Sequence, residues 1–234
     1  LNNGFGIVAG QPLRYIDDSA GLKEPGARPF KIAELDGFMV QGVFNDPATG
    51  LNAYAAYNQQ TGIVLVGVAG TNGFAKDWID TREDLALLGT KQSFTLADMP
   101  EFARALRVAV NEVGGVLGMN KLLISGQSLG GGIAAILGLH LVNGSPGGQN
   151  NGVYEDLRIP ANKVFVASIN GFGDEYSVRQ AGFTDEQIKA FSAEAALHRI
   201  VVQNVFTGEY DFVSQTGGQF SGTICGQAVG SSAA

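Results

Sequence analysis

The chain has 234 residues and a formal net charge of −7 at pH 7, with 45% hydrophobic and 16% charged residues. This composition supplies enough apolar surface for a buried core and excludes a wholly disordered chain. The acidic balance argues against nucleic acid as a partner and against purely electrostatic binding to anionic membranes, but it leaves an apolar lipid substrate open.

Cysteine usage and hydropathy narrow the class of protein further. Cys225 is the single cysteine of the sequence, so neither an intrachain disulfide nor a cysteine-based zinc site can form. No run of 18 apolar residues occurs, so we expect no transmembrane helix. The length fits one large domain or two small ones. We expect a single domain over residues 1–234, in which residues 1–36 form a turn-rich N-terminal segment of unassigned structure.

The first half of the chain predicts three strands followed by a helix. The strands cover residues 37–44, 51–58 and 62–70, and the turn sequences NDPATG and QQTG separate them. The third strand is a continuous apolar run, as expected for a strand that is buried on both faces. A helix is then predicted from about Pro100, because Phe102, Leu106 and Val110 recur at helical spacing.

The second half alternates strand and helix. Strands are predicted over 121–125, 163–170 and 199–206, and helices over 133–142 and 184–197, the latter with Thr184 as N-cap. Few core residues follow Gly217. This alternation predicts an α/β fold with a mostly parallel sheet and helices on both faces. Ligands of such sheets bind at the carboxyl ends of the strands, where Thr71, Ser128, Asn170 and Asp211 follow predicted strands.

The sequence GQSLGGG (126–132) lies where a predicted strand becomes a predicted helix. A serine at such a sharp turn projects its hydroxyl above the sheet, and small residues are needed two positions before and after it. Gly126 and Gly130 occupy those positions around Ser128. With 34 glycines in the chain, an ordinary glycine loop is an alternative; a phosphate-binding loop is disfavoured because no lysine follows the glycines.

Three segments resemble the lipase class 3 family. GQSLGGGIAA is similar to its nucleophile segment, commonly GHSLGG, and VLVGVAGTNGFAKDWIDTREDL (64–85) to its oxyanion segment. VVQNVFTGEYDFVSQTGGQF (201–220) resembles the segment that carries the family's catalytic acid. Secreted bacterial lipases with glycine-rich calcium repeats show a similar order and spacing. The departures are Ala69, where the family usually has arginine, and Gln127, where it usually has histidine.

The resemblance implies an α/β-hydrolase-like fold and a role for each matched residue. Ser128 would be the nucleophile, and the backbone N–H groups of Thr71 and Leu129 would form the oxyanion hole. Asp211 would be the catalytic acid. The supporting residues of the oxyanion segment would be Asp77, Trp78 and Asp80. The alternatives are a capped turn at Thr71, solvated turn acids at 77 and 80, and a surface carboxylate at Asp211.

The expected histidine is missing from the position that the resemblance gives it. The family order is Ser, Asp, His, but the 23 residues after Asp211 (234 − 211) contain no histidine. His140 follows Ser128 by 12 residues on the same predicted helix, about 18 Å along the axis, and His198 begins a strand, so we expect it at the opposite edge of the sheet. Three explanations stay open: a chain incomplete at its C-terminus, an inactive binding module, or a different base.

The sequence therefore predicts a serine carboxylic-ester hydrolase, of lipase or phospholipase type, that acts through an acyl-enzyme at Ser128. An inactive hydrolase-fold binding module and an acyltransferase using the same serine are the alternatives. We expect a lipid or ester substrate, contact of residues 84–97 with lipid aggregates as an apolar lid, and a secreted or cell-surface location in a bacterium. The expectation is no cofactor; calcium is implied by the resemblance alone, and the oligomeric state is unassigned.

Overall fold

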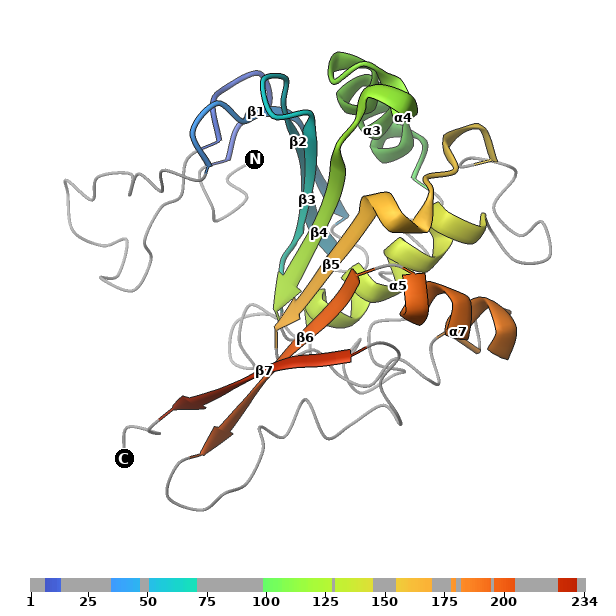
Figure 1. Ribbon diagram of the computed structural model, residues 1–234. Helices are drawn as coiled ribbons and strands as arrows, with labels where there is room; N and C mark the ends of the chain where they lie inside the picture. The colour runs from blue at the N-terminus through green and yellow to red at the C-terminus, as the bar shows by residue number, and fades with distance from the viewer. Residues whose placement is uncertain are drawn as a thin grey trace.

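A computed structural model shows one mixed β-sheet covered by helices (Figure 1). The residues that the structure describes are 7–13, 35–46, 51–70, 99–127, 129–144, 155–169, 178–179, 182–194, 196–204 and 223–230. The sheet has seven strands that lie in the same order as in the sequence. Their bounds are β1 Met39–Asp46, β2 Leu51–Asn58, β3 Ile63–Val68, β4 Lys121–Gln127, β5 Val164–Ile169, β6 Ala196–Asn204 and β7 Thr223–Gly230.

The sheet changes direction at β3. Strands β1 to β3 form an antiparallel meander, and strands β3 to β7 are all parallel. Short turns connect the antiparallel strands, whereas each parallel pair needs a longer crossover. The described helices lie in the three crossovers between β3 and β6. The α/β class and the mostly parallel sheet predicted from the sequence are confirmed.

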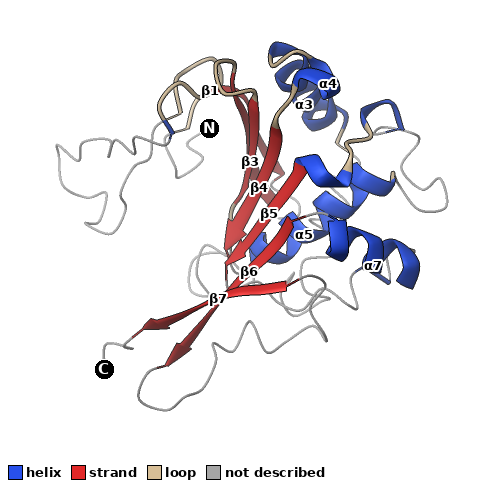
Figure 2. Cartoon of the chain, viewed as in Figure 1, coloured by secondary structure: helices blue, strands red, loops and turns tan. Residues whose placement is uncertain are grey.

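The long described helices cover one face of this sheet (Figures 1 and 2). They are α3 Pro100–Glu112, α5 Leu129–Asn143 and α7 Asp185–Glu194, with a short α4 at Gly115–Gly118 and 3-10 turns η3 Glu155–Leu157 and η4 Ala161–Lys163. Successive parallel strands are added in one direction, so right-handed crossovers place their helices on a common face. The sequence predicted helices on both faces of the sheet. Among the described residues, the long helices cover this face only.

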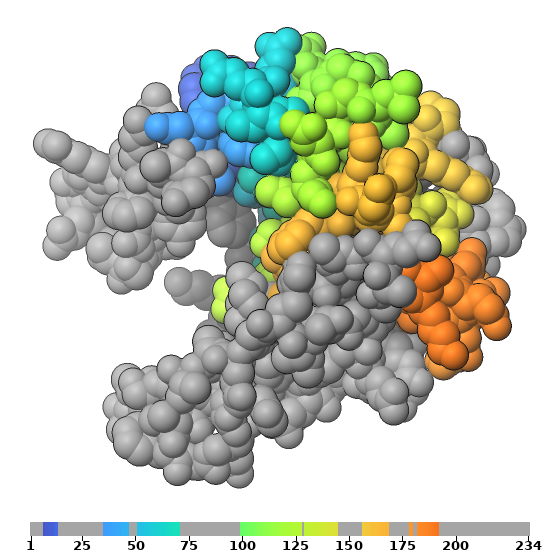
Figure 3. Space-filling view, in the orientation of Figure 1, coloured from blue at the N-terminus to red at the C-terminus, as the bar shows by residue number. Residues whose placement is uncertain are grey.

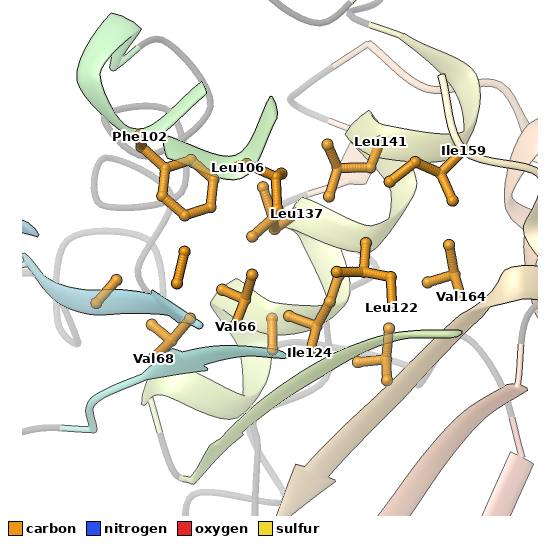
Figure 4. Close-up of a cluster of buried hydrophobic side chains, with 14 of the residues drawn as sticks. Val66, Val68, Phe102, Leu106, Leu122, Ile124, Leu137, Leu141, Ile159 and Val164 are labelled. Carbon is orange, nitrogen blue, oxygen red and sulfur yellow. The ribbon is translucent and has the colours of Figure 1, made fainter. Parts of the chain in front are cut away.

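The main hydrophobic core lies between the sheet and these helices (Figure 4). From the sheet, Val66, Leu122, Ile124 and Val164 point toward the helices, and Leu106 of α3 meets them from the other side. Helix α5 is buried along nearly its whole length, because it lies between strands β3 to β5 and α7. That position explains why its sequence is apolar on every side rather than on one face.

A second, smaller core covers the opposite face of the sheet at β1 to β3. It contains Leu13, Phe38, Val40, Ala56 and Leu65, all buried. Residues 10–13 lie beside β1 and bring Leu13 to this core: the backbone N–H of Leu13 donates to Phe38 O (2.8 Å), and that of Gly10 to Val40 O (2.8 Å).

Polar side chains link the segments that precede β4 to those that precede β5. The Lys163 ammonium donates to the carbonyl oxygens of Val116 (2.8 Å), Leu117 (2.9 Å) and Met119 (2.7 Å), so it caps the residues around α4. Charged side chains form a bidentate pair between α3 and η3, Arg107 with Asp156. These contacts lie far along the strands from the GQSLGGG segment and stabilise the scaffold.

The expected elements occur with shifted ends and one addition. Strand β2 has the predicted bounds, and Thr184 forms a reciprocal pair with Gln187 (N to Oε1 2.9 Å, N to Oγ1 3.3 Å), as its predicted capping role requires. The predicted helix over 184–197 ends at Glu194, and β6 begins at Ala196 instead of 199. The residues after Gly217, for which no strand was predicted, include β7 beside β6.

Candidate active site

The GQSLGGG segment joins β4 to α5 with a single residue between them. Strand β4 ends at Gln127 and helix α5 begins at Leu129. Ser128 is that intervening residue and lies outside the described residues. A strand that converts to a helix within one residue brings the strand end and the first helical turn against each other, which leaves little space for side chains two residues away on either side.

The two glycines that flank this junction have no room for a side chain. A Cβ on Gly126 would overlap the carbonyl group of Gly130 and lie 2.9 Å from Gly131 N. A Cβ on Gly130 would lie 2.5 Å from Val68 O and 2.6 Å from Ala69 O. The obstructing atoms belong to the backbone, so no rotamer change can relieve the overlap. Gly130 thus allows the first turn of α5 to touch the end of β3.

This contact brings the segment after β3 to the amino end of α5. Val68, the last residue of β3, pairs with Gly126 of β4, and the backbone N–H of Ala69 donates to Asn52 O (2.9 Å). The side chain of Asn52 accepts a hydrogen bond from Asn45 Nδ2 (2.6 Å). The described chain continues to Gly70, so Thr71 follows it directly, although Thr71 itself is outside the described residues.

The predicted site residues divide into two groups. Gly126, Leu129 and Gly130 are described, and all three are buried, with Leu129 1% exposed. The other predicted residues lie outside the described part of the chain: Thr71, Asp77, Trp78, Asp80, Ser128 and Asp211. The predicted lid over 84–97 lies outside it as well.

His140 is not placed to act on Ser128. It lies in the last turn of α5, 1% exposed, with its ring edge-on to Phe183 at 4.9 Å between centroids. Neither ring nitrogen has a hydrogen-bond partner within the described residues. Burial lowers the pKa of His140 to about 4, because an imidazolium loses its hydration there. His140 is therefore a neutral core residue.

His198 lies in the middle of the sheet and not at its far edge. It is the third residue of β6 and pairs with Ala167, which pairs with Ser125. The expectation that it lies at the opposite edge was wrong, because β6 begins three residues earlier than predicted. Strand geometry of about 3.3 Å per residue and 4.8 Å between strands puts its Cα about 12 Å from that of Gln127, which lies two strands away and two residues further along.

Neither a metal cluster nor a membrane span occurs in the described part of the chain. No group of three or more His, Cys, Asp or Glu side chains is close enough there to hold a metal ion. Within the same residues, every helix is too short or too polar to cross a bilayer.

Two residues of the site were missed by sequence reasoning. Asn52 holds the backbone just after β3, and Asn45 in turn holds the side chain of Asn52. The register of β1, β2 and β3 creates this arrangement, and the polar ends of the two hairpin strands, Asn45 and Asn52, were the only signal in the sequence.

Comparisons with known proteins give structural similarity alone. No family model and no curated protein sequence matches the chain. Among solved structures, it is similar to a Rhizomucor miehei lipase–propeptide complex (11% identity, TM-score 0.45, covering 72% of this chain and 50% of that one). It is also similar to lipase II from Rhizopus niveus (12%, 0.45, 71% and 58%) and to a Penicillium expansum triacylglycerol lipase (13%, 0.43, 72% and 62%). The match thus spans half to three fifths of each lipase, and similarity at this level does not assign this chain to a family.

Proposed function

We propose that the chain carries the core of a serine ester hydrolase that acts on lipid esters through an acyl-enzyme at Ser128. The observation that carries the proposal is the junction between β4 and α5. One residue separates strand from helix, and Gly126 and Gly130 provide the close backbone contacts that such a turn requires. An ordinary glycine loop does not need two positions blocked by backbone atoms.

The proposed chemistry uses backbone groups on two sides of the serine. Ser128 Oγ attacks the ester carbonyl carbon, and the oxyanion accepts hydrogen bonds from the N–H groups of Leu129 and Thr71. The contact of Gly130 with Val68 and Ala69 supports this pairing, since it brings the segment leading to Thr71 next to the first turn of α5. The alcohol leaves with the serine proton, and water then releases the acid from the acyl-enzyme.

Proton transfer needs a base, with Asp211 proposed as the carboxylate that orients it. His140 is excluded by its burial within α5. His198 and a group other than the two histidines are the remaining candidates. The position of His140 also favours a second proposal, an inactive hydrolase fold that binds a ligand or partner, since one of only two histidines is committed to the core.

Labelling with a fluorophosphonate ester, followed by intact mass, tests the nucleophile. Ser128→Ala should abolish labelling and leave the unfolding temperature nearly unchanged, and Asp211→Asn should slow labelling strongly. Labelling of Ser128→Ala at the wild-type rate would remove Ser128 from the mechanism. Wild-type protein that is folded but never labels would support the binding-module proposal. If the wild type labels, the labelling rate of His198→Gln tests whether His198 is the base: a strongly slowed rate would support it, and a wild-type rate would exclude it.

Lipid as the substrate class is part of the same proposal, with residues 84–97 as an apolar lid. If a lid opens on lipid aggregates, hydrolysis of a short-chain ester should rise steeply above the concentration at which the substrate forms micelles. A smooth saturation curve through that concentration would contradict the lid. Transfer of the acyl group to an added alcohol, faster than to water, would instead identify an acyltransferase.

A further inference from the structure

His140 lies in the last turn of α5, where this helix contacts Phe183. Its ring packs edge-on against Phe183 (4.9 Å between centroids, 70° between planes), and it is 1% exposed. Both ring nitrogens lack a hydrogen-bond partner within the described chain. A polar group buried without a partner lowers the stability of the fold, so a residue of this kind is an unusual choice for a core position.

The chain around Phe183 and α7 meets α5 through a small set of apolar side chains. Val178, Phe183 and Phe191 are buried, with Phe191 so close that a Cβ on Gly138 would lie 2.8 Å from its Cζ. Apart from Phe191, the side chains of α7 whose burial is described are exposed or half-buried, and Figure 3 shows α7 on the surface (orange). Helix α7 meets α5 through Phe191, and Phe183, just before α7, meets it through the ring of His140; α7 also contacts β6 and η4.

Among the charged side chains near His140 whose burial the structure describes, none lies in the core beside it. They are all exposed to solvent: Asp156, Arg158, Arg179, Asp185, Glu186 and Lys189. Arg179 is paired with Asp185 (2.7 Å) and Asp156 with Arg107. On the sheet side, Lys163 of η4, next to β5, donates to three backbone carbonyls. A proton on His140 would thus create a charge surrounded by apolar groups.

We propose that His140 is an acid-operated latch: its protonation releases α7 and Phe183 from α5, while the sheet and α3 stay folded. This inference goes beyond the proposed function and does not depend on it, since the latch operates whether or not Ser128 is a nucleophile. The boundary of the released part follows from the packing. Helix α5 contacts β3, β4 and β5, whereas α7 contacts β6 and η4 besides α5, so the proposed release also separates α7 from these two elements.

The sign and size of the effect follow from proton linkage. His140 has a pKa of about 4 in the closed state, against an ordinary value of 6.5 when it is exposed to water. The open state therefore binds the proton more tightly, and stability present above pH 6.5 is lost as the pH falls toward 4. The ratio of open to closed molecules should rise about 20-fold between pH 7 and pH 5, and about 300-fold in the limit well below pH 4.

Hydrogen exchange followed by mass spectrometry tests the latch. At pH 7, 6 and 5, after correction for the intrinsic exchange rate, protection of α7 peptides should fall about 20-fold, while α3 peptides keep theirs. In His140→Phe and His140→Leu, which cannot take up the proton, α7 protection should not fall. His198→Gln, which changes the other histidine, should respond like the wild type. Loss of protection in α3 together with α7 would overturn the latch, as would an unchanged acid response in either folded His140 variant.

A second measurement keeps the inference testable if both His140 variants fail to fold. With two histidines in the chain, the imidazole proton resonances of the wild type can be assigned by comparison with His198→Gln. The chemical shift of the His140 resonance should keep the value of the neutral imidazole until the protection of α7 is lost. A His140 resonance that titrates near pH 6.5 in protein with intact α7 protection would refute the latch.

Discussion

Replacing Gly130 with alanine tests the packing of β3 against α5 at its tightest point. The new Cβ would lie 2.5 Å from Val68 O and 2.6 Å from Ala69 O, whereas ordinary contacts begin at 3.4 Å. Backbone atoms cannot rotate away, so α5 and the end of β3 must separate by about 1 Å. Overpacking of this kind costs about 1–3 kcal/mol, against a gain of about 1 kcal/mol from helix propensity. We expect the free energy of unfolding to fall by about 0–2 kcal/mol, the difference between these two terms.

The same displacement should affect the proposed chemistry more than the stability. The N–H groups of Leu129 and Thr71 would move apart, and a misplacement of about 1 Å can lower a rate about 100-fold. Urea unfolding measures the stability, and the rate of fluorophosphonate labelling measures the chemistry. Gly138→Ala is the matched control, because it lies in the same helix but its Cβ would meet side-chain atoms of Phe191 and Val166, which can shift.

Two results would refute this reasoning. If Gly130→Ala unfolds at the wild-type urea concentration and labels at the wild-type rate, the contact between β3 and α5 does not have the geometry described. If Gly138→Ala slows labelling as much as Gly130→Ala, the effect comes from general loosening of α5 and not from the junction.

Three further predictions concern the scaffold. Lys163→Met should lower the free energy of unfolding by about 1–3 kcal/mol, since three carbonyls lose their donor, whereas Lys121→Met, which loses one bond at 3.1 Å, should have little effect in the same urea titration. Hydrogen bonding to Arg107 lowers the pKa of Asp156 from its ordinary 3.8. The stability that this pair adds is therefore present above pH 3.8 and is lost as the pH falls through the lowered pKa. Arg107→Ala should abolish this acid-dependent step in the free energy of unfolding, which is at most about 1 kcal/mol because the pair is exposed. Ile124→Ala removes a fully buried side chain of the core in Figure 4. It should lower the free energy of unfolding in urea by about 2–5 kcal/mol, and an unchanged free energy would contradict the burial of Ile124.

Most elements of the fold can be predicted from local sequence, because their signals are local. The continuous apolar run at β3 and the turn sequences on either side of β2 identify those strands without any knowledge of their neighbours. Strand β7 could not be found in this way. Its sequence, TICGQAVG, is rich in small residues, and its extended backbone is defined by pairing with β6, which is a contact between distant parts of the chain.

The candidate site shows the same division. The motif predicts crowding two positions on either side of Ser128, and in the structure neither Gly126 nor Gly130 has space for a Cβ. Spacing along α5 also predicted that His140 lies too far from Ser128. Its burial beside Phe183 is a contact between distant parts of the chain, which this spacing does not encode. The anchoring of Ala69 by Asn52 depends on the register between β2 and β3, which no local pattern encodes.

The junction and the base contribute separately to catalysis, and this separation can be measured. Backbone donors at Leu129 and Thr71 would stabilise an oxyanion whether or not a histidine accepts the serine proton. In serine hydrolases, removal of a triad member leaves a residual rate roughly 10³–10⁴ above that in water, which comes from the oxyanion hole and from binding. A chain with the junction but no base should therefore hydrolyse an activated ester slowly, and Gly130→Ala should reduce that slow rate while Ser128→Ala leaves part of it. A base-equipped enzyme would instead lose far more activity with Ser128→Ala than with Gly130→Ala, so the ratio of the two losses distinguishes the two states of the protein.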